Sequence, residues 1–261
     1  MSDKQHTFAI CAYKDSEYLE CCIKSLIGQR EYSDIIMCTS TPDEYIGHMA
    51  DKYDIPMYIR EEESDIVDDW NFAVDHVKTQ WLTVAHQDDV YDEQYSKVLL
   101  EEISKMPDAV FAFTDYHPIK DGIITTDLNS RLRRFFRSPM KCSKLAHSKF
   151  WKKYILSCGN SICCPTCAYK KDGIPGVIFR SHLKFACDWE TFEELSHLDA
   201  PFLYIPKVLT YYRIHEGATS MEWTVSNRRE EEELYMFRKF WPEWCVKIGY
   251  RLFRISYNTY D

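Results

Sequence analysis

The chain has 261 residues, 45% of them hydrophobic, which is enough to bury the core of one large domain or of two closely packed halves. Its formal net charge of −9 and its pI near 5.5 argue against general nucleic-acid binding by the whole molecule. No run reaches the roughly 18 apolar residues of a membrane span, and the opening residues MSDKQHTFAI lack the apolar core of a signal peptide. We therefore expect a cytoplasmic protein whose eleven cysteines are reduced thiols rather than a disulfide framework.

The first half of the chain alternates apolar strand patterns with amphipathic helix patterns. Strands are predicted at residues 7–12, 35–38, 55–59, 81–85 and 109–113. The helices between them are predicted to follow caps at Asp15 or Ser16, to span Glu44–Lys52, to follow a cap at Ser64, and to run through Ile103, with Gly28 ending the first of them. Continuously apolar strands that alternate with helices predict a mostly parallel sheet covered on both faces.

Two adjacent carboxylates, Asp88 and Asp89, follow the predicted strand at 81–85. In sheets of this kind, ligands bind beyond the carboxyl ends of the strands. The chain has neither a G-x-G-x-x-G nor a G-x-x-x-x-G-K-[ST] loop, so a bound diphosphate would need another means of neutralisation. Carboxylates that hold Mg²⁺ or Mn²⁺ are the simplest such means. The competing interpretation is that the pair only begins a helix ahead of Tyr91-Asp92-Glu93.

Positive charge is concentrated in one segment of this acidic chain. Residues 128–171 contain no Asp or Glu but hold 11 of the 32 Lys and Arg residues. The segment predicts either contact with an anionic partner at one place or a solvated helix face.

Several segments in order resemble the family 2 glycosyltransferases. FAICAYKDSEYLECCIKSL resembles the opening strand, turn and helix of that family, and AHQDDVY resembles its DxD segment. Thr114-Asp115-Tyr116 with Asp121-Gly122 is similar to the strand and hairpin that follow the DxD segment. Cys187–Glu190 is similar to the Glu-Asp-Trp that opens a helix carrying the catalytic base, and Tyr212–Ser220 looks like the late YRxHxxxxS segment.

The resemblance implies an α/β fold of the GT-A type: a Rossmann-like, mostly parallel central sheet flanked by helices, with an irregular acceptor-binding half and C-terminal helices. We expect a nucleotide-sugar-binding half over residues 1–115, an acceptor-binding and catalytic half over 116–225, and a C-terminal helical extension over 226–261.

The activity implied is metal-dependent transfer of a sugar, with inversion, from a nucleotide-diphosphate sugar to a hydroxyl of a glycan or lipid-linked acceptor. A UDP- or dTDP-sugar is the expected donor, Mn²⁺ or Mg²⁺ the expected cofactor, and a bacterial polysaccharide the expected product class. Asp188 is the implied base; without the resemblance it would be read as a helix N-cap. Asp88, Asp89 and His215 are the implied metal ligands. The implied nucleotide-sugar contacts are Ala12, Tyr13, Ser40, Thr41, Asn71, His86, Gln87, Asp88 and Arg213.

Three positions depart from the family pattern. His86 stands where the first Asp of the DxD motif usually is. Cys38-Thr39-Ser40-Thr41-Pro42-Asp43 replaces the acidic DDGS whose carboxylate holds the nucleobase, and Trp70-Asn71 replaces an Arg-Asn pair.

Other classes of function stay open on the sequence alone. A catalytically inactive nucleotide-sugar-binding or regulatory module would keep the fold without turnover. Cys164 and Cys167 have the spacing of a redox or zinc motif, within a segment, 162–169, that is otherwise predicted as a strand. After Pro242, a basic, aromatic-rich amphipathic helix predicts either peripheral contact with the inner face of a membrane or packing on the catalytic domain.

Overall fold

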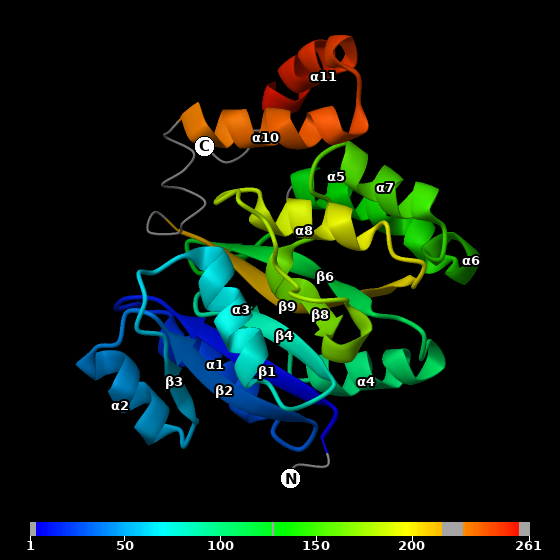
Figure 1. Ribbon diagram of the computed structural model, residues 1–261. Coiled ribbons are helices and arrows are strands. Elements are labelled where there is room, and N and C mark those ends of the chain that lie inside the picture. The colour runs from blue at the N-terminus through cyan, green and yellow to red at the C-terminus, as the bar shows by residue number, and fades with distance from the viewer. Residues whose placement is uncertain (1–3, 127, 216–226, 256–261) are drawn as a thin grey trace.

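The computed structural model describes residues 4–126, 128–215 and 227–255 (Figure 1). Its centre is a nine-stranded sheet in the order β3-β2-β1-β4-β8-β6-β9-β5, with β7 paired to β6. The strands are β1 (His6–Ala12), β2 (Ser33–Thr39), β3 (Met57–Ile59), β4 (Trp81–His86), β5 (Val90–Tyr91), β6 (Phe111–Lys120), β7 (Ile123–Ile124), β8 (Cys167–Lys170) and β9 (Phe202–Ile214).

The sheet combines a parallel half with a mixed half. β3, β2, β1 and β4 are parallel neighbours, and β6 and β9 are also parallel. β8 is inserted antiparallel between β4 and β6, and β5 and β7 form short antiparallel pairs at the margins. The predicted fold class is confirmed, and each antiparallel pairing extends over only two or three residue pairs.

Helices cover both faces of the sheet, because successive strand residues point to opposite sides. On β4, Trp81 and Ala85 pack into one hydrophobic cluster, and Leu82 and Val84 pack into the other. The first cluster contains residues of α1 (Leu19–Ile27), α2 (Glu44–Lys52) and α4 (Tyr95–Lys105). The second contains residues of α3 (Ile66–His76), α7 (Lys149–Ser157), α8 (Cys187–Leu195) and α10 (Asn227–Phe240). Helices α5 (Leu128–Arg137), α6 (Ser143–Ala146) and α11 (Glu243–Ile255) complete the described helices.

Local details differ from the sequence patterns at four places. α1 begins at Leu19 after Tyr18, so neither Asp15 nor Ser16 is its cap. The cap of α3 is Asp65, whose carboxylate accepts from Val67 and Asp68, so the prediction of Ser64 was wrong. The predicted strand at 162–169 is a 3₁₀ turn, Cys164–Thr166, followed by β8. β6 continues to Lys120, so the expected boundary at residue 115 falls inside a strand shared by both halves.

The C-terminal helices pack on α8 and on each other rather than projecting from the molecule. Trp189 of α8 packs against Phe237 and stacks on Phe240 of α10, with ring centroids 5.1 and 6.2 Å apart. α11 folds back on α10, where the Tyr250 hydroxyl donates to Glu233. Figure 1 shows this helix pair outside the layer of α7 and α8. In the described ranges, no helix is both long and apolar enough to span a membrane.

A buried polar network supports the start of the parallel half. His6 is completely buried, and its ring nitrogens bond to Ser33 Oγ at 2.7 Å and to Thr83 Oγ1 at 3.0 Å. Burial lowers the pKa of His6 to about 3, so this imidazole is neutral at pH 7.

Candidate active site

Asp88 and Asp89 lie in the turn that follows β4. The short strand β5 comes next, and α4 begins only at Tyr95, with Gln94 at its N-cap position. The helix-start interpretation of the two carboxylates is therefore wrong. The pair occupies the carboxyl edge of the parallel strands, where open α/β sheets bind their ligands.

Asp88 meets His215, which is far from it in the sequence. Its Oδ2 lies 3.2 Å from His215 Nε2, and its Oδ1 lies 3.4 Å from the Ser16 hydroxyl. The His215 ring packs edge-on against Tyr18, and its Nε2 is buried without an aligned hydrogen bond among the described groups. A carboxylate oxygen and an imidazole nitrogen at this separation suit one divalent cation, since neighbouring ligand atoms around Mg²⁺ lie roughly 3 Å apart.

Arg213 organises the two carboxylates. Its backbone N–H donates to Asp89 Oδ1 and its Nε donates to the backbone oxygen of Asp88, both at 2.8 Å. The guanidinium lies over the ring of Tyr18, 4.4 Å from the centroid. Tyr18, which the sequence patterns did not indicate, thus contacts both Arg213 and His215. Residues 216–220 of the predicted late segment lie outside the described residues.

Asp89 is the more buried of the two acids, with 1% of its surface exposed. Burial raises its pKa well above the usual value, and the neighbouring Asp88 adds to the rise. Its Oδ2 has no hydrogen-bond partner among the described groups and lies 3.9 Å from His86 Nδ1. The described contacts of Asp89 hold the Arg213 backbone, and its role as a metal ligand stays a prediction.

His86 occupies the end of β4 as a neutral ring. It stacks on Trp70 with centroids 5.4 Å apart, and burial lowers its pKa to about 4. Its Nε2 is buried and has no described partner. The two departures from the family pattern at positions 70 and 86 are therefore in direct contact, which neither motif revealed alone.

Hydrogen bonds join the segments that carry the predicted nucleotide contacts at the ends of β1, β2 and β4. The Gln87 amide accepts from Tyr13 N at 2.9 Å and donates to Tyr13 O at 2.8 Å, joining the turn after β4 to the residue after Ala12. Thr41 Oγ1 accepts from the backbone N–H of Lys14 at 2.7 Å. The Ser40 hydroxyl donates to Asp69 at 2.8 Å.

Asn71 fixes a loop of the second half. Its Nδ2 donates to Phe179 O at 2.7 Å, and its Oδ1 accepts from Phe179 N at 3.1 Å. Both ends of the amide are therefore engaged by backbone. A nucleotide contact by Asn71 stays a prediction.

Asp188 lies in the first turn of α8 but is not its cap, because the N-cap position belongs to Ala186. Its Oδ1 accepts from Trp189 N, and its Oδ2 accepts from Asn160 Nδ2, both at 2.7 Å. Burial outweighs these bonds and raises the pKa of Asp188 to about 6. A carboxylate with that pKa is ionised near neutral pH and is a stronger proton acceptor than an ordinary Asp.

A carboxylate from the C-terminal extension holds the start of α8. Glu232 of α10 accepts from the backbone N–H groups of Lys184 at 3.1 Å, Phe185 at 2.8 Å and Ala186 at 2.9 Å. The four-residue acidic run at 230–233 contains this residue but gives no indication of which Glu reaches the start of α8. The C-terminal helices are therefore part of the support for Asp188.

The cysteine motif lies in the buried core, near the carboxylates of Asp89 and Asp188. Cys163, Cys164 and Cys167 are buried, and burial raises the pKa of all three thiols. The carboxylates of Asp89 and Asp188 both add to the rise for Cys163, so both lie within electrostatic reach of that thiol. Protonated, enclosed thiols are poor nucleophiles and poor metal ligands, which argues against the redox and zinc interpretations.

Much of the basic segment is engaged within the protein. Arg134 and Arg137 both donate to Asp115, which is 1% exposed and also accepts from the Tyr204 hydroxyl. Lys152 is buried and donates to the carbonyl oxygens of Leu198 and Ala200. The segment therefore owes part of its charge to internal pairing, and an anionic partner stays a prediction.

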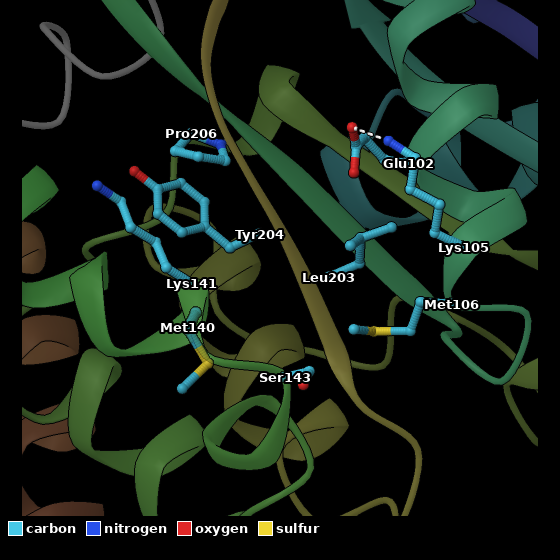
Figure 2. A pocket seen from close by; sticks show the side chains of 9 residues that line it. All are labelled: Glu102, Lys105, Met106, Met140, Lys141, Ser143, Leu203, Tyr204 and Pro206. Atoms are coloured by element: carbon cyan, nitrogen blue, oxygen red, sulfur yellow. Dashed lines mark hydrogen bonds and ion pairs between the residues drawn. The ribbon is translucent and has the colours of Figure 1, made fainter.

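A pocket of about 390 Å³ lies away from these acids (Figure 2). Figure 2 shows the bonded pair Glu102 and Lys105 on one side of β9 and Met140, Lys141 and Tyr204 on the other. The predicted site residues are absent from its lining. The chemistry therefore points to the carboxyl edge of the sheet rather than to this pocket.

The ordered motifs, and the meeting of Asp88 and His215 at one sheet edge, agree with a comparison of the sequence with known families. The model of the family described as "Glycosyl transferase family 2" matches residues 7–165, more than half of the chain. The chain belongs to glycosyltransferase family 2. No curated protein gave a match.

Solved structures share the fold at low sequence identity. S. aureus TarS 1-349 is 15% identical with a TM-score of 0.56, covering 80% of this chain and 60% of the TarS chain. The same protein in complex with UDP-GlcNAc is 16% identical with a TM-score of 0.60, covering 89% and 65%. A mannosyltransferase, PcManGT from Pyrobaculum calidifontis in complex with GDP-Man and Mn²⁺, is 12% identical with a TM-score of 0.64, covering 90% and 63%. The family 2 chain thus spans less than two thirds of these relatives.

Proposed function

We propose that the chain is an inverting, metal-dependent glycosyltransferase that moves a sugar from a nucleotide-diphosphate sugar to an acceptor hydroxyl. The observation that carries the proposal is the meeting of Asp88 and His215, 3.2 Å apart at the carboxyl edge of the sheet. Family membership supports the reaction class, and the structures with UDP-GlcNAc or with GDP-Man and Mn²⁺ support a nucleotide-sugar donor.

The donor is placed along the ends of β1, β2 and β4. In the proposal, the base lies by Ser40 and Thr41, and the ribose lies near His86, Gln87 and the backbone after Ala12. UDP- and dTDP-sugars are the donors we expect. Asn71, whose amide holds the Phe179 backbone, stays a proposed contact of the nucleotide.

Asp88 and His215 are the proposed ligands of Mn²⁺ or Mg²⁺, with Asp89 next to them. In the described part of the chain, no three His, Cys, Asp or Glu side chains converge closely enough to hold a metal alone. Two protein ligands would leave positions around a bound cation open to the substrate. A cation held there would neutralise negative charge on the departing diphosphate. Arg213 holds the Asp88–Asp89 turn in place.

Asp188 accepts the proton of the acceptor hydroxyl as its oxygen attacks the anomeric carbon. The Asn160 and Trp189 bonds fix the two carboxylate oxygens, and the pKa of about 6 leaves the group ionised at neutral pH. This assignment has one base and no second catalytic carboxylate. The reaction is therefore a single displacement, which inverts the configuration of the anomeric carbon. The acceptor is proposed to be a glycan or lipid-linked hydroxyl of polysaccharide biosynthesis.

The halves 1–115 and 116–225 are proposed as donor and acceptor parts of one domain, with 226–261 as its helical support. We also propose action in the cytoplasm, with peripheral contact at the inner face of the membrane through α11. The support is that Trp244 and Ile248 of this helix are 68% and 62% exposed, while Val246 and Tyr250 face α10.

The test is calorimetric titration of the protein with UDP, with and without Mn²⁺. We expect Asp88→Ala to remove the Mn²⁺-dependent part of the affinity, and Asp51→Ala, at an exposed position on α2, to leave it unchanged. Mn²⁺ dependence that survives Asp88→Ala contradicts the metal assignment. A second assay measures release of nucleoside diphosphate from a panel of nucleotide-sugars. Release indicates an active enzyme, and binding without release indicates a catalytically inactive binding module.

A further inference from the structure

The hydroxyl of Ser40 has a fixed polarity. Ser40 follows the last residue of β2, is partly exposed, and donates its proton to Asp69 Oδ2 at 2.8 Å. Asp69 is held by Arg60 Nε at 2.8 Å and by the Ser64 hydroxyl at 3.0 Å. An ionised carboxylate only accepts hydrogen bonds, so the Ser40 proton points inward and its oxygen presents lone pairs outward.

Thr41 has the opposite polarity. Its Oγ1 accepts from the backbone N–H of Lys14 at 2.7 Å, and a backbone N–H can only donate. The Thr41 proton therefore remains available to an outside acceptor. Ser40 and Thr41 are adjacent and partly exposed at the proposed nucleotide-sugar edge of the sheet. Together they present one hydrogen-bond acceptor and one hydrogen-bond donor.

We propose that Ser40 and Thr41 select donors whose base carries a ring N–H beside a carbonyl, as in uracil, thymine and guanine. The Ser40 oxygen accepts from the ring N–H, and the Thr41 hydroxyl donates to the carbonyl. Cytosine and adenine present the reverse pattern, a ring nitrogen that accepts beside an amino group that donates. The Ser40 oxygen would then face an acceptor, and the Thr41 hydroxyl would face a donor. This inference rests on the proposed function, because it takes the end of β2 to be the base end of the nucleotide site.

Asp69 is the positioning residue of this arrangement. The family pattern places a base-binding carboxylate directly after the second strand, and this chain has none there. Instead, α3 supplies a carboxylate that acts on the base through the Ser40 hydroxyl. Arg60 donates to Oδ1, so an Asn at position 69 would keep its oxygen toward Arg60 and turn its amide donor toward Ser40. The Ser40 proton would then point outward.

The experiment is calorimetric titration with UDP, GDP, CDP and ADP, each with Mn²⁺. For the wild type we expect UDP and GDP to bind at least about tenfold more tightly than CDP and ADP, because a mismatched base covers both hydroxyls and leaves them unpaired. Ser40→Ala should weaken UDP and GDP about three- to tenfold and change CDP less than about twofold. Wild-type binding of CDP as tight as that of UDP overturns the inference.

Asp69→Asn tests the polarity directly. It should reduce the UDP:CDP preference by about tenfold or more, whereas Ser64→Ala, which removes another hydroxyl from the same carboxylate, should leave it unchanged. If Asp69→Asn does not fold, Thr41→Val, which removes the hydroxyl and keeps the side-chain shape, should reduce the preference in its place. Equal binding of all four nucleotides refutes the base selection alone, whereas no binding of any of them refutes the proposed nucleotide site as well.

Discussion

Replacing Asp188 by Asn should make the protein more stable at alkaline pH and not at acidic pH. Burial raises the pKa of this carboxyl from its ordinary value of 3.8 to about 6. An Asp with a raised folded-state pKa destabilises the fold where it is ionised. The penalty is absent below pH 3.8, grows between 3.8 and about 6, and is complete above 6.

The magnitude follows from the two pKa values. A difference of about two units corresponds to about 3 kcal/mol, since one unit is about 1.4 kcal/mol. Asn keeps an oxygen for the Trp189 N–H but places an amide near the Asn160 donor, which costs about 1 kcal/mol. The net gain at pH 8 is therefore about 2 kcal/mol, or roughly 4–8 °C in melting temperature for a chain of this size.

The assay is urea unfolding of the wild type and Asp188→Asn at pH 8 and at pH 4.5. Asp172→Asn, at an exposed position, is the matched control and should show no difference between the two pH values. An Asp188→Asn variant that is no more stable than the wild type at pH 8 would show that burial does not raise this pKa. A gain of equal size at both pH values would show that the carboxylate charge is not its cause.

Three further expectations concern stability and surface contact. Glu232→Ala leaves three N–H groups at the start of α8 without their acceptor, so it should lower the unfolding free energy by about 1–3 kcal/mol in urea unfolding. The control Glu231→Ala removes an exposed side chain and should change the unfolding free energy little. Burial lowers the pKa of His6 in the folded protein to about 3, below the ordinary value of 6.5, so wild-type stability should fall as pH drops through 6.5. His6→Gln should reduce that loss of stability in acid unfolding. Trp244→Ala combined with Ile248→Ala should abolish sedimentation with anionic liposomes if α11 contacts the membrane, and unchanged sedimentation would exclude that contact.

The parallel half was predictable because its signals are local. Short apolar runs separated by amphipathic stretches specify β1 to β4 and their helices, and the position of Asp88 at a strand end follows from that order. The placement of β8 was not predictable, because its antiparallel partners Trp81 and Phe113 belong to strands far away in the sequence.

Candidate site residues were predictable only where a motif supplied them. Asp88, Asp188 and His215 belong to motif-like segments, and the structure brings Asp88 and His215 together. Glu232 and Asp69 each accept several hydrogen bonds, some of them from residues far away in the sequence. Nothing in the sequence around these two residues distinguishes them from ordinary acidic helix residues. Residues that position a reactive group therefore need the folded arrangement before they can be recognised.

We expect the charges around position 86 to favour a neutral side chain such as His86 over the usual first Asp. Asp88 and Asp89 are already adjacent, and His86 contributes a neutral ring stacked on Trp70. His86→Asp would add a third carboxylate at this edge. In EDTA, this variant should therefore melt at a lower temperature than His86→Asn, because Asn has the shape of Asp without its charge. Mn²⁺ should raise the melting temperature of His86→Asp more than that of His86→Asn, because a cation offsets the added repulsion. Equal melting of the two variants in EDTA would show that carboxylate repulsion does not act at position 86, and a neutral side chain would then have no electrostatic advantage there.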